Sequence, residues 1–195
     1  MLSPPPDSSL ILSKARPEPE ARPLLDPSRI RIVSQKVVCS DEELLQLKAY
    51  LSPMDTRRMG KLMKACLLSA FTALKDAGIA RPDAIIAATS KGMLEFSNLF
   101  LEEIAANHEE LLKPTIFMQS THNTIASAIA IRTSCHGYNI TYSHGEESSA
   151  WAVWDAKRLL RSGEAATVLV CAFDEALLDG RTDRFRAEST IYMID

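Results

Sequence analysis

The sequence predicts an α/β fold in which helices cover both faces of a mostly parallel sheet. Short apolar runs typical of buried strands alternate along the chain with amphipathic helical segments. Strands joined through helices form right-handed crossovers, which pair their strands in parallel. The chain has 195 residues, 46% of them hydrophobic, and this is enough for one domain with a sizeable core.

The first expected strand, residues 30–38, reads IRIVSQKVV and shows near-alternating apolar positions. A short helix is expected at 41–51, and a long one after Pro53-Met54-Asp55, from Arg57 to Gly78, since glycine commonly ends helices. The run DAIIAAT at 83–89 is apolar, as fully buried strands are.

The second half of the chain continues the alternation. A loop and a helix are expected within 90–112, Pro114 ends that helix, and 115–124 is expected to be partly extended. The remaining elements are a small-residue helix, a strand, a helix and a buried strand, at 125–135, 139–143, 148–163 and 166–173. The sheet should therefore have four or five strands.

Seven of the ten prolines lie within the first 29 residues, which predicts a flexible arm at 1–29 before a folded domain at 30–195. The arm contains acidic residues and no apolar core, which argues against a signal or transit peptide. A net charge of −3 gives no reason to expect nucleic acid or a membrane as partner, and no apolar run could span a bilayer.

The cysteines, at positions 39, 66, 135 and 171, are far apart and form no C-x-x-C pair. Three of them lie in apolar runs, where a buried free thiol is the commoner state. Together with the absence of a secretory signal, this favours a reduced, cytoplasmic protein.

The least ordinary stretch is TYSHGEESSAW, residues 141–151, where a strand runs into a helix. His144-Gly145-Glu146 has the H-x-E form of zinc deaminases but lacks the P-C-x-x-C that completes their metal site. No metal and no cofactor are therefore expected.

The two serines at this elbow suit either serine chemistry or simple helix capping. GEESSAW lacks the G-x-S-x-G pattern of a nucleophile elbow, so Ser148 and Ser149 are expected to cap the helix. The helix dipole would stabilise Glu146 and its neighbour Glu147. A hydrolase or acyltransferase that pairs either serine with His144, or with His122 in QSTHNT, remains an alternative, as does an acyl- or aryl-binding domain without chemistry.

The order of these pieces resembles the N-terminal half of a β-ketoacyl synthase, a thiolase-like condensing enzyme. The likeness covers residues 54–175 and includes Arg57-Arg58-Met59 before the Ala-rich helix. Its other components are DAIIAATSKG, STHNTIASAIAIRTSCHGYNITYS and AVWDAKRLLRSGEAATVLVCAFDEA. The fold that the resemblance implies is a thiolase-like half-fold.

The resemblance implies a catalytic cysteine at this elbow, and its counterpart here is Glu146, give or take one residue. The family's two further histidines belong to a C-terminal half, and His122 and His144 do not correspond to them. The chain alone is therefore not expected to catalyse ketoacyl condensation, and no catalytic residue is assigned beyond the elbow candidates Glu146, His144, Ser148 and His122.

The closest likeness is to short, single-domain proteins associated with type II fatty-acid or polyketide synthesis, including aryl polyene and flexirubin-like pigment pathways. It implies a non-condensing accessory subunit, comparable to a chain length factor. Its expected partner is a second copy or a full-length ketoacyl synthase, with acyl carrier protein as a further possible partner. The strand NITYS, residues 139–143, is the one the family uses at its dimer interface.

Overall fold

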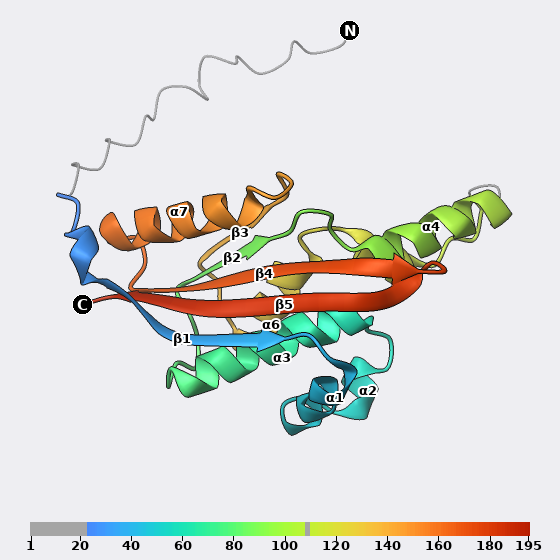
Figure 1. Ribbon diagram of the computed structural model, residues 1–195, viewed down its shortest axis with the longest axis horizontal. Coiled ribbons are helices and arrows are strands. Elements are labelled where there is room, and N and C mark those ends of the chain that lie inside the picture. Colours follow the sequence, from blue (N-terminus) through green and yellow to red (C-terminus); the bar gives the residue numbers. More distant parts are fainter. Residues whose placement is uncertain (1–22, 108–109) are drawn as a thin grey trace, which may run out of the picture.

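A computed structural model describes residues 23–107 and 110–195, and a five-stranded mixed sheet runs through its centre (Figure 1). Most of the predicted arm, residues 1–22, lies outside the described residues. The strands lie in the order β1-β5-β4-β2-β3, where β1 is Ile30–Val38, β2 Ala84–Ala88, β3 Tyr138–Tyr142, β4 Thr167–Leu178 and β5 Arg181–Ile194. The helices are α1 (Asp41–Leu44), α2 (Pro53–Thr56), α3 (Lys61–Asp76), α4 (Leu94–Asn107), α5 (Pro114–Ser120), α6 (Thr124–Thr133) and α7 (Ser148–Arg161), and 3-10 turns cover Pro27–Arg29 and Leu45–Ala49.

Strand β2 shows why both faces of the sheet are covered. Successive side chains of a strand point to opposite faces. Ile85 and Ala87 belong to the core cluster that contains α3 and α6, whereas Ile86 packs into the second cluster, with α7. Because both faces need apolar side chains, all five residues of β2 are buried and apolar, and this explains the continuous run in the sequence.

The α/β fold class is confirmed. In the parallel part of the sheet, helices connect one strand to the next along the chain, as predicted. Strand β2 pairs in parallel with β3 and with β4. The predicted helix stops at Gly78 and Gly163 both have a backbone φ of +69°, a conformation that glycine adopts at little cost.

The sheet is less parallel than expected because β4 and β5 form one long antiparallel hairpin. Its turn, Asp179-Gly180, has positive φ at both residues, as the commonest two-residue hairpin turns require. Strand β1 then adds antiparallel to β5 at the edge of the sheet.

The prediction of an extended segment at 115–124 is wrong. Pro114 opens helix α5 at its first turn, where its missing N–H costs nothing and its fixed φ suits a helix. Helix α5 packs against α4 through the rings of Phe100 and Phe117, whose centroids are 5.3 Å apart. Helix α4 extends beyond the end of the sheet (Figure 1).

Candidate functional site

The elbow at residues 143–147 lies at the carboxyl end of β3, beside the carboxyl ends of β2 and β4. Parallel strands in adjacent register bring their following loops together there, and open α/β sheets bind their ligands at that edge. The sequence TSKG, residues 89–92, is the loop after β2, and Asp174 follows the parallel part of β4. These three segments form the candidate site.

Asp174 holds the loop after β2 in place. Its carboxylate accepts hydrogen bonds from the backbone N–H groups of Ser90 and Lys91, both at 3.0 Å, and from the Thr89 hydroxyl at 2.9 Å. Thr89 Oγ1 in turn accepts a hydrogen bond from the Gly92 N–H at 2.8 Å. This carboxylate directly follows the apolar run ATVLVCAF and is not among the site residues predicted from the sequence.

Ser148 is buried beneath the elbow and contacts backbone groups. Its Oγ lies 2.7 Å from the His144 N–H, from which it accepts a hydrogen bond. It is also 2.8 Å from the Thr89 carbonyl and 2.7 Å from the Gly145 carbonyl, and its one proton serves these acceptors. The side chain is 1% exposed. Within the described residues no imidazole contacts this hydroxyl, so the geometry gives Ser148 a structural role.

The expectation that the two serines cap α7 is wrong. The cap position is Glu147, which makes no side-chain cap hydrogen bond, and Ser148 is the first helical residue. The reason is the inward turn of the Ser148 hydroxyl, which joins the elbow to the loop after β2. Ser149 is exposed and lines a small cavity of about 170 Å³ together with Asp174.

The other elbow candidates are on the surface. Glu146 is exposed, and His144 Nε2 lies 3.8 Å from a Glu147 carboxylate oxygen, with both side chains more than 70% exposed. Side chains so open to water provide no desolvated environment in which to activate a nucleophile or a base.

His122 lies apart from these residues, on the rim of a cavity of about 770 Å³. The cavity is lined by the turn between α5 and α6, by β3 and by the first elbow residue, Ser143. The imidazole lies against Gly92, where any larger residue would collide with it, because an added Cβ would be 2.2 Å from Nε2. Of the predicted candidates, the structure therefore brings His122 to the loop after β2 and leaves His144 outside this cavity.

Two polar side chains of β3 line the same cavity. Asn139 donates a hydrogen bond from Nδ2 to the Ala126 carbonyl at 3.2 Å. The Thr141 hydroxyl is buried, and it has no hydrogen-bond partner within the part of the chain that the structure describes. A buried hydroxyl without a partner is costly, so this cavity is suited to a group that supplies a hydrogen bond.

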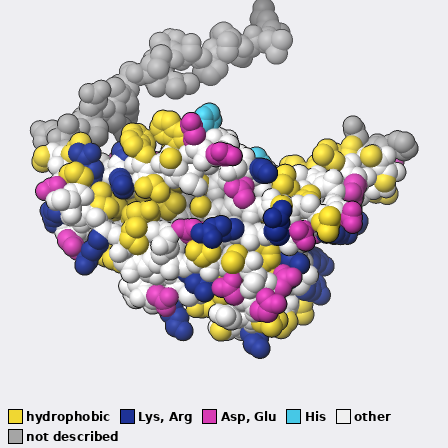
Figure 2. Space-filling model, viewed as in Figure 1, with side chains coloured by type: hydrophobic (Ala, Val, Ile, Leu, Met, Phe, Trp, Pro, Cys, Tyr) yellow, Lys and Arg dark blue, Asp and Glu magenta, His cyan; other side chains and the backbone are white. Residues whose placement is uncertain are grey.

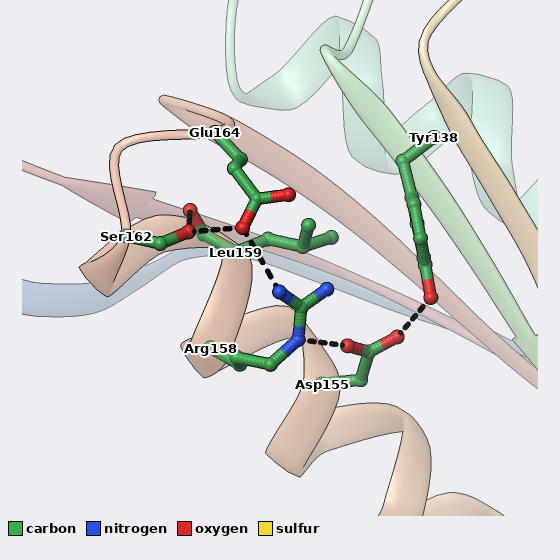
Figure 3. A network of polar contacts seen from close by, with 6 residues as sticks. All are labelled: Tyr138, Asp155, Arg158, Leu159, Ser162 and Glu164. Carbon is green, nitrogen blue, oxygen red and sulfur yellow. Dashed lines mark hydrogen bonds and ion pairs between the residues drawn. The ribbon is translucent and has the colours of Figure 1, made fainter. Parts of the chain in front are cut away.

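A polar network ties β3 to α7 (Figure 3). The Tyr138 hydroxyl donates to Asp155 Oδ2 at 2.8 Å, and Arg158 Nε donates to Asp155 Oδ1 at 2.8 Å. Arg158 also pairs with Glu164 at 2.9 Å, beyond the end of the helix. Burial, and then the Asp155 carboxylate, raise the pKa of Tyr142 to about 12, so this phenol stays neutral near the carboxylate.

Asp155 is not among the predicted site residues, although its position in the helical pattern points to a buried, paired carboxylate. It stands seven residues after Ser148 on the same face of the helix as Ala152 and Leu159, and all four are buried. A carboxylate on a buried helical stripe must be paired, since a lone buried charge is prohibitively costly.

Three of the four cysteines are buried, as predicted: Cys66 in α3, Cys171 in β4 and Cys135 just after α6. Burial raises the pKa of the Cys66 thiol well above its usual range, which disfavours a reactive thiolate. Cys39 is exposed after β1, and the elbow itself contains no cysteine.

Residues 23–107 and 110–195 contain no cluster of three or more His, Cys, Asp or Glu side chains able to hold a metal ion. Over the same residues, no helix has the length and hydrophobicity needed to cross a membrane.

The family of this chain is shown by a match to a family model. The model of the β-ketoacyl synthase N-terminal domain matches residues 34–187, most of the chain. The chain belongs to this family. The match includes every strand of the parallel part of the sheet and the whole elbow.

Solved ketosynthase structures share the fold. A ketosynthase (ApeO) in complex with its chain length factor (ApeC) from Xenorhabdus doucetiae is similar at 19% identity and a TM-score of 0.67, over 86% of this chain and 79% of that one. The ishigamide ketosynthase/chain length factor matches at 22% identity and a TM-score of 0.63, over 75% of this chain and 47% of that one.

A type II polyketide synthase complex of an acyl carrier protein with its ketosynthase bound to the hexaketide, AntDE:AntF, has a TM-score of 0.63 at 11% identity. The likeness covers 85% of this chain and 62% of that one, so this β-ketoacyl synthase domain spans only part of the length of some relatives. Among proteins with curated descriptions, no sequence matches the chain.

Proposed function

We propose that this β-ketoacyl synthase domain is a non-condensing subunit, comparable to a chain length factor, that pairs with an active ketosynthase in polyketide-type biosynthesis. The observation that carries the proposal is the open edge of β3, next to an elbow without a cysteine. An acyl carrier protein would then meet the assembled pair.

The open edge supports pairing because the two edges of the sheet differ. Strand β1, at one edge, carries Arg31 and Lys36 and a register shift between Ile32 and Ser34. Charges and bulges are the usual means by which proteins protect an edge strand from pairing. Strand β3, at the other edge, reads YNITY and has neither a charge nor a register shift, so its backbone groups are available to a partner strand.

The surface beside β3 is apolar, which also supports a protein partner. Phe117, Met118 and Ile131 are 52%, 64% and 77% exposed and line a groove of about 470 Å³ between α5 and α6. The groove shares Thr121 and Ser127 with the cavity at β3. Large contiguous apolar patches on a protein surface mark interaction sites.

The elbow supports a subunit without condensing chemistry. Condensing enzymes need a thiolate, whereas this elbow has an exposed histidine and two exposed carboxylates, and the buried hydroxyl of Ser148 next to it contacts backbone groups. A carboxylate at the start of a helix is stabilised by the dipole but is a poor acyl acceptor.

Co-purification tests the pairing. The tagged chain is co-expressed with a full-length ketosynthase from the same organism, and the complex is measured by size-exclusion chromatography with light scattering. Ile131→Asp adds a charge at a side chain that is 77% exposed, so it should weaken the complex at least tenfold without unfolding the chain. The matched control is Leu45→Asp, at a residue 68% exposed near α1, and it should leave the complex intact.

Equal losses from both variants, or a chain that binds no ketosynthase at micromolar concentration, would refute the proposal.

A further inference from the structure

Both tryptophans of the chain lie on the outward face of α7. Trp151 and Trp154 are 45% and 57% exposed, and their ring centroids lie 5.9 Å apart in an edge-to-face arrangement. The inner face of the helix packs on the sheet through Ala152, Ala156 and Leu159, so the core is complete without the indoles. Because a covered aromatic side chain buries about 150–250 Å², two indoles left in water forgo a sizeable hydrophobic gain.

The charges along the same face are arranged in order. Glu147 stands at the start of α7, and Lys157 and Arg161 follow the tryptophans at its end. Figure 2 shows the same polarity: hydrophobic side chains gather over α7, acidic side chains lie near its elbow end and basic ones near its other end. The spacing of three or four residues keeps this set on one helical stripe.

We propose that two copies of this chain associate through their α7 helices, which pack antiparallel about a two-fold axis. If the axis passes between residues 152 and 153, Trp151 of each copy faces Trp154 of the other. The same symmetry brings Glu147 of each copy to Lys157 and Arg158 of the other. A stripe that reads acidic, aromatic, aromatic, basic is complementary to itself in this arrangement, as a two-fold interface requires.

The segment before β1 adds a second wall to the interface. Leu25 N donates a hydrogen bond to the Arg161 carbonyl at 2.8 Å, which holds this segment along the end of α7. Leu24, Pro27 and Trp154 then border a groove of about 340 Å³. In the antiparallel pair, Trp151 of the second copy enters this groove.

The size of the interface sets its strength. An α-helix of 14 residues is about 21 Å long and about 10 Å wide. The area of one helix face, its length times its width, is a fraction of the roughly 800 Å² that each partner buries in a standard interface. We therefore expect a weak association with a micromolar dissociation constant. The residues of this surface are on α7 and on the segment before β1, and none is on β3, so the association adds to the proposed pairing with a ketosynthase and does not replace it.

Sedimentation velocity and tryptophan fluorescence test the dimer together, over concentrations from about 1 to 100 µM that bracket a micromolar constant. Since both tryptophans lie in the interface, their emission should shift to shorter wavelength as the sedimentation coefficient rises. Trp154→Glu, at an exposed position, should abolish association. The measurements are repeated in an Ile131→Asp background, which removes association through the surface beside β3.

A charge exchange tests the register. Glu147→Lys places a lysine of one copy against Lys157 and Arg158 of the other, and Lys157→Glu places the new glutamate against Glu147 of the other copy. Because like charges then meet, each variant alone should dimerise about three- to tenfold more weakly. In a mixture of the two, both cross-copy contacts pair opposite charges, and a mixed dimer should form with near wild-type affinity.

Two results would overturn the proposal: a wild-type chain that stays monomeric at the highest concentration, or a dimer whose affinity is unchanged by Trp154→Glu. Failure of the mixed pair to recover would overturn the antiparallel register. None of these results depends on a ketosynthase, so this proposal can fail while the proposed function stands.

Discussion

At the scale of single residues, Glu175 shows how one shared proton sets a pH dependence. The Thr182 hydroxyl lies 2.6 Å from the carboxylates of both Glu95 and Glu175, but it has a single proton to donate. A second proton must therefore sit on one carboxyl group. Burial raises the pKa of Glu175, which favours the protonated form of this carboxyl group.

Glu175→Gln should therefore stabilise the protein at pH 8. A glutamine can donate to Thr182 and still accept the hydrogen bond that the Glu95 N–H donates to Glu175 at 3.0 Å. A carboxyl group with a raised pKa contributes stability that is fully present below its unfolded value, about 4.3, and is lost as pH rises through its folded value. The variant should be more stable than the wild type at pH 8 and should differ little from it at pH 4. Urea denaturation at both pH values measures this, and equal effects at the two would contradict it.

Ser148→Ala should destabilise the fold by about 1–3 kcal/mol, since it removes the buried hydroxyl that bonds the His144 N–H and the Thr89 carbonyl. Ser149→Ala, one residue along and exposed, is the matched control and should change the free energy of unfolding by less than about 0.5 kcal/mol. Thermal or urea unfolding compares the two. A stable Ser148→Ala chain that had lost a measured hydrolase activity would instead make Ser148 a nucleophile.

At the scale of elements, the attachment of α7 to the edge strand depends on Asp155, which is 2% exposed. Asp155→Ala should cost about 2 kcal/mol or more, because it leaves the Tyr138 hydroxyl and the Arg158 guanidinium without a buried partner. Tyr138→Phe removes one hydrogen bond and should cost about 1 kcal/mol. Denaturant titration gives both values, and a larger loss for Tyr138→Phe than for Asp155→Ala would contradict this account.

The helices and strands differ in how far local sequence determines them. Strands β2 and β4 were predictable because burial on both faces demands an unbroken apolar run, and the helix stops at Gly78 and Gly163 because few other residues tolerate a positive φ. Helix α5 was missed since its apolar residues, 116–118, are consecutive and form no helical stripe. Strand β5 was missed since charged residues such as Arg184 interrupt its pattern where one side faces water.

The site was harder to predict than the fold because its contacts join distant segments. The His122 ring reaches the cavity only because Gly92, thirty residues earlier, has no side chain. The Ser148 hydroxyl points inward because it donates a hydrogen bond to the Thr89 carbonyl. No local pattern records either contact.

For the molecule as a whole, we propose that this β-ketoacyl synthase domain contributes to condensation through a partner and carries out none itself. The measurement that tests it most directly is condensation of acyl- and malonyl-carrier-protein substrates, followed by mass spectrometry, for the chain alone, the ketosynthase alone and the pair. We expect no ketoacyl product from the chain alone, and product from the pair that disappears when the ketosynthase's catalytic cysteine is replaced by alanine. Ketoacyl product from the pure chain, lost on substitution of Glu146 or His144, would contradict it.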